Sequence, residues 1–277
     1  MNQFAEDLLW VVNSPSLIAP GATHSPISPA QIDRPRLTSF MNEGLSKKVG
    51  PYFERLILYW LIHIRSVEIV AHGEQVRVDG RTLGEMDFLF VDELGRLTHW
   101  EVAVKFYLYL PDEPLRGSRF VGPNSSDSFE RKTTRLYEHQ LALSKKVRDD
   151  VVVREALMKG CLFYPPGIHS VREFPRWMSA NHERGIWVRR RDLEKLAHPS
   201  EEYRILRKPY WLSACPANGE HASAMDWNDF VSEVDRQMAQ YQRPVFAARR
   251  ENSVEAAEPT APSFSRFFIV PDDWPGE

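Results

Sequence analysis

The strongest hydrophobic pattern in the chain is helical and lies around residue 57. Apolar residues recur there every three or four positions, which predicts a helix with one buried face, made by Phe53, Leu56, Ile57, Trp60, Leu61 and Ile64. From Val67 to Leu110 the pattern changes to short alternating runs, with Gly80 and Gly95 at two of the breaks. Such alternation between turn residues is typical of strands joined by hairpins. We therefore expect a three-stranded antiparallel meander directly after the helix.

A second helix and a buried strand are predicted after the meander. Between residues 129 and 145 one helical face carries Phe129, Thr133, Leu136, Gln140 and Leu143. The apolar run Cys161 to Tyr164 ends at two prolines and predicts a buried strand. A strand over 185–189, a helix over 227–240 and a strand over 267–270 are expected further on. The order helix, three-strand antiparallel meander, helix, strand, with N- and C-terminal additions, predicts a mixed α/β chain of the α+β type.

At 277 residues the chain is long enough for one substantial core, and composition divides it into five parts. Residues 1–43 combine an N-terminal helix with a Pro-rich connection, and residues 44–166 form the core. Residues 167–246 extend the same domain. Residues 247–263 have the Ala, Glu, Pro and Ser content of a flexible linker. Residues 264–277 form a tail whose apolar start is expected to dock on the body.

The turn between the second and third strands fixes which residues face each other. A three-residue hairpin loop usually ends in a residue with positive φ, which suits Gly95, so Asp92 pairs with Arg96. This register sets Asp87 directly opposite Glu101. A two-residue loop is rejected because it would set the apolar positions of one strand against polar positions of the other. The chosen register gathers the apolar residues on one face: Met86, Phe88, Phe90, Trp100, Val102 and Val104.

The two acids on the opposite face predict a bound cation. Directly opposed residues have Cβ atoms about 5 Å apart, and two like charges there are destabilising unless a proton or a cation lies between them. Asp87 and Glu101 form such a pair. Magnesium, or manganese, is the cation expected beside one or two carboxylates and several waters. The alternative is a solvent-facing surface on which Lys105 and Arg96 partly neutralise the acids, and the pair alone leaves both open.

Two helical residues add to the candidate site. Glu54 borders the buried stripe of the first helix, where a carboxylate needs a partner. Gln140 lies on the apolar face of the second helix, where it either bonds the backbone as a core amide or contributes to the site. With the hairpin acids, both are expected to converge on one place.

Charge narrows the class of protein. The formal net charge of −3 gives no global attraction to phosphate, which argues against a protein that coats nucleic acid through bulk electrostatics. Local basic candidates are residues 189–191 and 204–208, beside Trp187 and Trp211. Each cluster is either a nucleic-acid contact with a stacking platform or a solvated edge beside a packed tryptophan.

Localisation and cysteine usage point to an ordinary intracellular protein. The longest apolar stretch is too short to cross a bilayer, and the N-terminus has no secretory leader, so the cytoplasm is expected and no membrane partner is. Cys161 and Cys215 have no paired spacing, so neither a disulfide framework nor a zinc site is expected. The oligomeric state has no signature in the sequence.

These features resemble the core of the PD-(D/E)XK nuclease superfamily over about residues 44–166. The resemblance rests on the order of the elements and on Glu54, Asp87, Glu101 and Lys105. A closer resemblance, extending over most of the chain, is to a family of uncharacterised bacterial proteins, a domain of unknown function that has been linked to that superfamily. Four segments carry it: Gly84–Asp87, Trp100–Leu108, His139–Leu141 and Val270–Pro275.

The resemblance implies a restriction-endonuclease-like core and magnesium-dependent hydrolysis of phosphodiester bonds in DNA or RNA. Asp87 and Glu101 would be metal ligands, and Glu54 would supplement them. Lys105 would orient or polarise the attacking water, while Gln140 would support the site from the second helix. In such a reaction the cation polarises the phosphate and lowers the pKa of its bound water.

One spacing departs from the superfamily pattern. The usual order is acid, any residue, lysine, whereas here Ala103 stands where the acid is expected and Lys105 follows Glu101 by four positions. Lys105 therefore starts about 6 to 7 Å further along the strand. Glu85, opposite Ala103 in this register, is a candidate compensating metal ligand. Three functions stay open: a magnesium-dependent nuclease, a catalytically inactive nucleic-acid or protein interaction module that keeps the fold, and a hydrolase of small phosphate esters.

Overall fold

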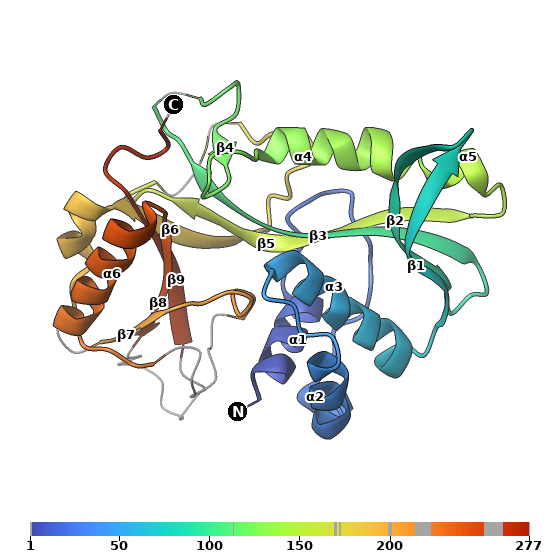
Figure 1. The fold of residues 1–277 in the computed structure, drawn as a ribbon, viewed down its shortest axis with the longest axis horizontal. Helices are drawn as coiled ribbons and strands as arrows, with labels where there is room; N and C mark the ends of the chain where they lie inside the picture. Colours follow the sequence, from blue (N-terminus) through green and yellow to red (C-terminus); the bar gives the residue numbers. More distant parts are fainter. Residues whose placement is uncertain are drawn as a thin grey trace.

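A nine-stranded sheet with helices on both faces makes up the described part of the chain (Figure 1). The computed structural model describes residues 2–112, 114–168, 171, 173–198, 201–213, 223–251 and 263–276. The sheet is mostly antiparallel, so the predicted α+β class is confirmed. Within these ranges, no helix has the length and apolar character needed to cross a membrane.

The sheet begins with the predicted meander. β1 (Glu68–Val78), β2 (Arg81–Val91) and β3 (Leu97–Tyr109) pair antiparallel in this order. β5 (Val153–Tyr164) lies parallel to β3 along nearly its whole length, and the short β4 (Phe120–Val121) pairs with the end of β3. β3 and β5 therefore form the long centre of the sheet.

The C-terminal part of the chain completes the same sheet. β6 (Glu183–Arg189), β9 (Ser263–Val270), β8 (Val245–Glu251) and β7 (Glu202–Ile205) follow β5 in that spatial order. α6 (Trp227–Tyr241) packs on these strands, and a 3-10 helix, η4 (Arg190–Leu196), follows β6.

One predicted boundary is corrected by these strands. Residues 247–251 belong to β8, whereas the sequence placed them in a linker, because their small and charged side chains resemble a linker although the start of the strand, Val245 to Ala248, is buried. The strand predicted over 267–270 forms the end of β9, which pairs with both β6 and β8 and so lies inside the sheet. The remainder of the predicted linker, 252–262, lies outside the described residues, as does Cys215.

Three N-terminal helices cover one face of the central strands (Figure 1). They are α1 (Gln3–Asn13), α2 (Arg34–Asn42) and α3 (Val49–Tyr59), with a 3-10 turn, η1 (Pro29–Gln31), before α2. A π-helical turn, η2 (Trp60–Ile64), continues α3. The predicted apolar stripe of α3 packs against the Phe88, Phe90 and Trp100 side of the meander.

The predicted second helix covers the opposite face but is interrupted. α4 (Phe129–Arg135) continues through a π-helical turn, η3 (Leu136–Gln140), and the short α5 (Ser144–Val147) follows. Along β3, Trp100 and Val102 face α1 to α3, whereas Ala103 and Tyr107 pack beneath α4. Side chains of odd number on β3, Glu101 and Lys105 among them, therefore lie on the α4 side.

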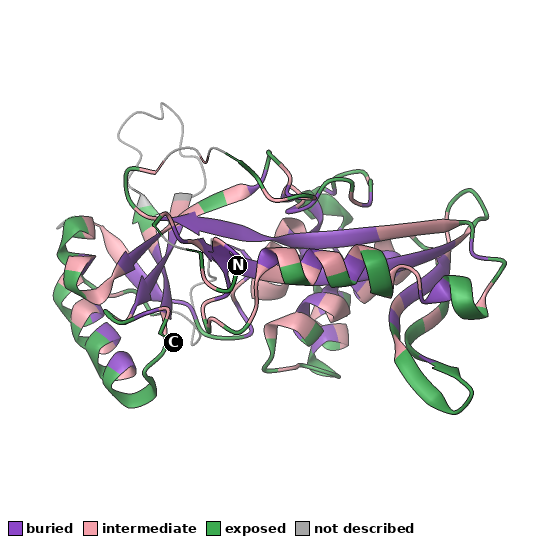
Figure 2. Cartoon of the chain, turned by 90° about the horizontal axis from the view of Figure 1, so that it is seen from above, coloured by how far each residue is buried: buried purple, intermediate pink, exposed green. Residues whose placement is uncertain are grey.

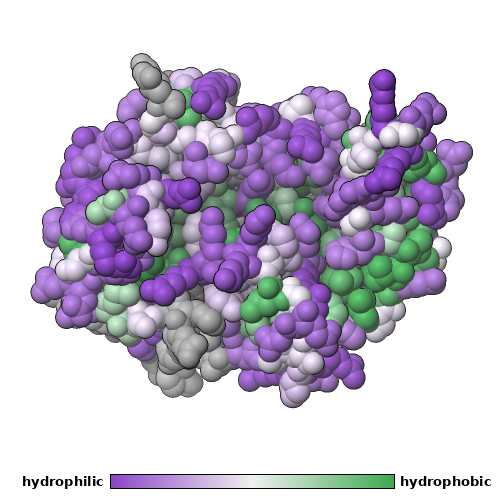
Figure 3. Space-filling model, viewed as in Figure 1, coloured by the Kyte–Doolittle hydropathy of each residue, from purple (hydrophilic) through white to green (hydrophobic). Residues whose placement is uncertain are grey.

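The β1–β2 hairpin projects from one end of the molecule. Figure 2 shows the central strands buried and the hairpin largely exposed. Its exposed apolar side chains include Val70, Val78 and Leu83, and Figure 3 shows a hydrophobic area on that side of an otherwise mainly hydrophilic face. The base of the hairpin, where β2 meets β3, is buried, and the candidate site lies there.

Candidate metal and catalytic site

The hairpin register is the one that the sequence predicts. Gly95 has φ of +74°, the Gly95 amide donates to the Asp92 carbonyl, and the Asp92 amide donates to the Arg96 carbonyl at 2.9 Å. The β2–β3 ladder then runs from Val91↔Leu97 to Phe88↔Trp100. Continued by one more rung, this register would set Asp87 opposite Glu101, and the two carboxylates are close enough to act on each other's charge.

Strands β2 and β3 separate at this rung. The Val102 amide donates to Asp87 Oδ2 at 2.8 Å, so a side chain ends the ladder in place of a backbone carbonyl. Before Asp87, β2 continues to pair with β1, with Glu85 beside Gln75, while β3 continues beside β5. Asp87 thus lies at a fork in the sheet, where groups from both faces approach each other.

Glu101 is held in a closed hydrogen-bonded environment. Its side chain is fully buried. His99 Nε2 lies 2.9 Å from Glu101 Oε1, and Gln140 Nε2 donates to Glu101 Oε2 at 2.6 Å. Each carboxylate oxygen therefore has one protein donor, and the position of the carboxylate is fixed from both sides.

A chain of polar contacts extends from Glu101 in both directions. Ser144 Oγ lies 3.0 Å from His99 Nδ1 and accepts from Arg154 Nε at 2.9 Å. Because the Ser144 oxygen accepts from Arg154, its hydroxyl hydrogen is free to point at His99 Nδ1. A neutral His99 that accepts at Nδ1 carries its proton on Nε2, which then donates to Glu101. On the other side, Lys132 Nζ donates to Gln140 Oε1 at 3.1 Å. The complete chain is Arg154, Ser144, His99, Glu101, Gln140 and Lys132.

The surroundings of the fork disfavour the ionised form of Asp87. Burial and the neighbouring Glu101 carboxylate raise the pKa of Asp87 from 3.8 to about 7. Burial and Glu85 raise the pKa of Glu54, which also acts on Asp87. Burial, together with the nearby Lys105, lowers the pKa of Lys132 although Asp87 and Glu101 act in the opposite direction. A cation bound between the two acids would stabilise their ionised forms.

The raised pKa of Asp87 makes stability depend on pH. An unfolded chain ionises this group near pH 4 and the folded chain near pH 7, so its contribution to stability is complete below pH 4 and is lost as the pH rises through 7. Asp87→Asn removes this loss. Without divalent ions, we expect the stability of the variant relative to wild type to increase between pH 4 and pH 8, by at most about 4 kcal/mol. Urea unfolding across this range tests it, and parallel stability curves would contradict it.

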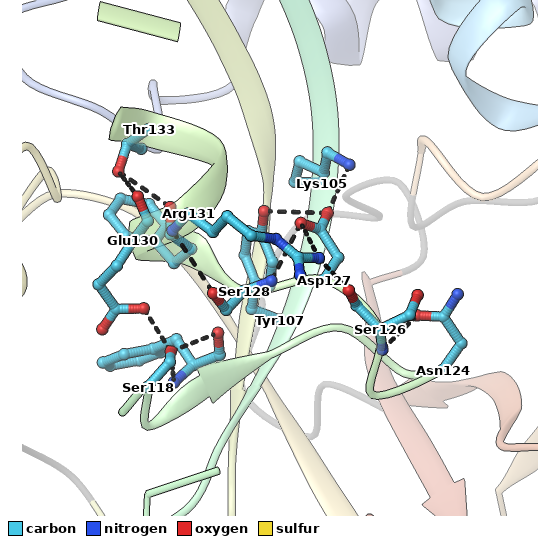
Figure 4. A network of polar contacts seen from close by, with 12 residues as sticks. Lys105, Tyr107, Ser118, Asn124, Ser126, Asp127, Ser128, Glu130, Arg131 and Thr133 are labelled. Carbon is cyan, nitrogen blue, oxygen red and sulfur yellow. Dashed lines mark hydrogen bonds and ion pairs between the residues drawn. The ribbon is translucent and has the colours of Figure 1, made fainter. Parts of the chain in front are cut away.

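Lys105 makes a contact that the sequence did not predict. Its Nζ lies 2.6 Å from Asp127 Oδ2, and Tyr107 Oη lies 3.4 Å from the same oxygen. Figure 4 shows the Lys105 and Asp127 side chains pointing toward each other, with Tyr107 beside them. Asp127 Oδ1 accepts from the Ser128 amide at 3.0 Å. Lys105 thus forms an ion pair with the loop before α4.

Lys132 is the site residue that the sequence reasoning missed. It lies four residues before Leu136 and eight before Gln140, and both of those had been placed on the buried face. A π turn takes in one more residue than an α turn, so residues eight apart across η3 share a face. Regular helical spacing places Lys132 near Leu136 only, and its contact with Gln140 depends on the π turn. His99, two residues before Glu101 on β3, also contacts it, which the sequence did not predict.

Two expectations for β2 are corrected. Met86 packs with Val76 and Leu143 instead of with Phe88, because β2 follows β1 away from β3 beyond the fork. Glu85 pairs with Gln75 and takes no rung opposite Ala103. The exposed Glu85 side chain turns toward β1: its Oε1 lies 3.5 Å from where a Cβ at Gly73 would stand. The structure brings Glu85 near Glu54, not into the Asp87–Glu101 pair.

The basic clusters at 189–191 and 204–208 are largely engaged within the chain. Arg189 Nη1 donates to the carbonyls of Asp272 and Trp274, at 2.7 and 2.6 Å, and Arg190 pairs with Asp235. Trp187 is buried against Trp274. These contacts account for the first cluster without a ligand. In the second, Lys208 lies over the Trp211 ring at the edge of a cleft described below.

The acids at the fork fit a hard divalent cation. Magnesium in proteins is usually held by one or two carboxylates, waters and substrate phosphates. Asp87 keeps Oδ1 without a hydrogen-bond partner among the described residues, and Glu101 supplies oxygen atoms beside it. Elsewhere in the described ranges, and at the fork itself, no three His, Cys, Asp or Glu side chains gather into a ready-made metal cluster. The candidate ligand set is therefore Asp87 and Glu101.

Comparison with known proteins gives one match. A family model described as "Domain of unknown function (DUF1853)" matches residues 6–270. No curated protein and no solved structure matches the chain.

Proposed function

Since the chain belongs to the family described as DUF1853, a domain of unknown function, its activity is inferred from the site, and we propose a magnesium- or manganese-dependent phosphodiesterase that cuts DNA or RNA. The observation that carries the proposal is the Asp87–Glu101 pair at the fork between β2 and β3. Two acids there, one with a pKa raised to about 7, favour a bound cation. The order α3, β1 to β3, α4 and β5 supports a restriction-endonuclease-like core of the PD-(D/E)XK type.

Each residue of the site has a role in this proposal. Asp87 and Glu101 hold the metal, which when bound polarises the phosphate and activates water. His99 and Gln140 fix the Glu101 carboxylate, as outer groups commonly do for metal ligands. Glu54 adds negative charge beside Asp87 and so strengthens the attraction for a cation.

Lys132 takes the place that the superfamily pattern gives to a lysine on the strand. Lys105 is paired with Asp127, whereas Lys132 bonds Gln140 and acts electrostatically on both Asp87 and Glu101. We assign to Lys132 the positive charge that stabilises the pentavalent phosphate.

The proposal is tested by incubating the purified chain with single- and double-stranded DNA and RNA, with Mg²⁺, with Mn²⁺ or with a chelator. Cleavage that requires the metal is expected on at least one substrate. Cleavage that survives chelation, or no cleavage on any substrate, would contradict it.

A second function is favoured by the closure of Glu101. The carboxylate is fully buried and both oxygens have donors, as in a fold that keeps its polar network without catalysis. A non-catalytic nucleic-acid or protein interaction module would bind its ligand equally well with and without metal. Its binding would also be unchanged in Asp87→Asn, and it would cleave nothing.

A further inference from the structure

A cleft opens beside the candidate site, between the start of α3 and the loop before α4. Its volume is about 440 Å³. β3 forms its floor with Lys105 and its neighbours. The loop contributes Asn124, Ser126 and Asp127, whose side chains Figure 4 shows together with Lys105. Lys48 closes it on the α3 side, and Lys208 with Trp211 on the other.

The cleft carries an excess of positive charge. Three lysines line it against one carboxylate, Asp127. That carboxylate is already shared, since Lys105 lies 2.6 Å and Arg131 3.7 Å from its two oxygens. Within the described ranges, neither Lys48 nor Lys208 has an ion-pair partner. Two cations therefore face the cleft without a compensating acid.

Other surroundings of the cleft also favour an anion. The first turn of α3 contains no acidic residue, and its cap residue, Lys48, offers no side-chain acceptor. Val49 and Gly50 from this turn line the cleft. Burial, and to a lesser extent the charge of Arg243, lower the pKa of Lys208. Trp211 is not a free stacking surface, because Lys208 covers its ring at 4.7 Å and Phe246 packs at 5.0 Å. The cleft would therefore recognise an anion by its charge and not by stacking.

We propose that this cleft binds a phosphate group of the nucleic-acid substrate, with Lys48 and Lys208 as its cations. The inference rests on the proposed function and adds the place where the nucleic-acid strand leaves the candidate active site. Glu101 and Lys105 are four residues apart on β3, about 13 Å along the strand. A duplex presents one phosphate per strand every 3.4 Å or so of its axis. A polynucleotide that crosses the Asp87–Glu101 pair therefore reaches the cleft.

The phosphate is either an internal phosphodiester or a terminal phosphomonoester, since both offer the same oxygens to lysine. Fluorescence anisotropy with a labelled oligonucleotide in chelator separates binding from cleavage. Oligonucleotides with a 5′-phosphate, a 3′-phosphate or neither distinguish the two sources. The variants are Lys48→Gln and Lys208→Gln, singly and together. Lys47→Gln is the matched control, because Lys47 is exposed and does not line the cleft.

Each cleft variant is expected to weaken binding and to lower the slope of log K against log salt by about 1, while Lys47→Gln keeps the wild-type slope. A loss confined to one phosphorylated end assigns the cleft to a terminal phosphate, and an equal loss on all three assigns it to an internal one. Wild-type affinity and slope in the double variant, or no binding by the wild type, would overturn the inference.

Cleavage assays on the same proteins keep the two proposals apart. Lysine-dependent binding without metal-dependent cleavage leaves the phosphate cleft standing and removes the nuclease. If the double variant binds as the wild type does and still shows metal-dependent cleavage, the nuclease proposal stands and the phosphate cleft is contradicted. Thermal melting checks that substitution of these exposed lysines leaves the fold unchanged.

Discussion

Asp87→Asn is expected to abolish metal-dependent cleavage while the protein stays folded. In the wild type the Val102 amide donates to Asp87 Oδ2 at 2.8 Å. Asparagine has the same shape and an oxygen that can accept this bond, but it lacks the negative charge that holds a cation. The loss should exceed the roughly 10- to 100-fold that removal of an outer group around a metal costs. The measurement is the cleavage rate in saturating Mn²⁺ on the best substrate of the panel.

The matched control for this variant is Glu74→Gln. Glu74 is an exposed carboxylate on the same hairpin, paired with Met86, so the substitution removes one negative charge at a distance from the fork. Its cleavage rate should equal that of the wild type. Comparable cleavage rates for the wild type and Asp87→Asn would show that Asp87 does not hold a catalytic metal.

Gly160→Ala is expected to lower the free energy of unfolding by more than about 4 kcal/mol. Gly160 has φ of +148° and pairs with Lys105 in the parallel β3–β5 ladder. A Cβ there would lie 1.7 Å from the Lys105 carbonyl oxygen and 2.7 Å from Leu17 Cδ1. The two central strands would have to move apart next to the site, since a backbone oxygen cannot rotate away as a side chain does. Urea unfolding, or the loss of soluble protein, measures the effect.

Gly50→Ala is the control for this variant. Gly50 lies in the first turn of α3 and has nothing within 4 Å of an added Cβ. Alanine there should stabilise the helix by about 0.5 to 1 kcal/mol. An unfolding free energy for Gly160→Ala close to that of the wild type would show that β3 and β5 are less closely paired than described.

The geometry at the centre of the candidate site could be predicted from the sequence because the local rules there are strict. Gly95 selects one turn, the turn selects one register, and the register places Asp87 beside Glu101. Helical periodicity likewise brought Gln140 to the buried side of its helix, and the structure joins it to Glu101 at 2.6 Å. Glu54 lies near enough to act on Asp87.

The rest of the candidate site depends on contacts that regular local patterns do not predict. Lys105 pairs with Asp127 because β4 folds the following loop back over β3, a connection with no local signal. Lys132 reaches Gln140 through a π turn that a regular helical wheel does not contain. The predicted strands over 185–189 and 267–270 are found in β6 and β9, but their parallel pairing has no local signal, because the two strands lie far apart in sequence.

Calorimetric titration of Mn²⁺ into the wild type, Asp87→Asn and Glu101→Gln tests the central claim most directly. One binding event is expected in the wild type, strengthening as the pH rises from 6 to 8, because the cation requires an ionised Asp87 whose pKa is about 7. Neither variant should show it. No binding by the wild type, or the same binding event in all three proteins, would contradict a metal site between Asp87 and Glu101.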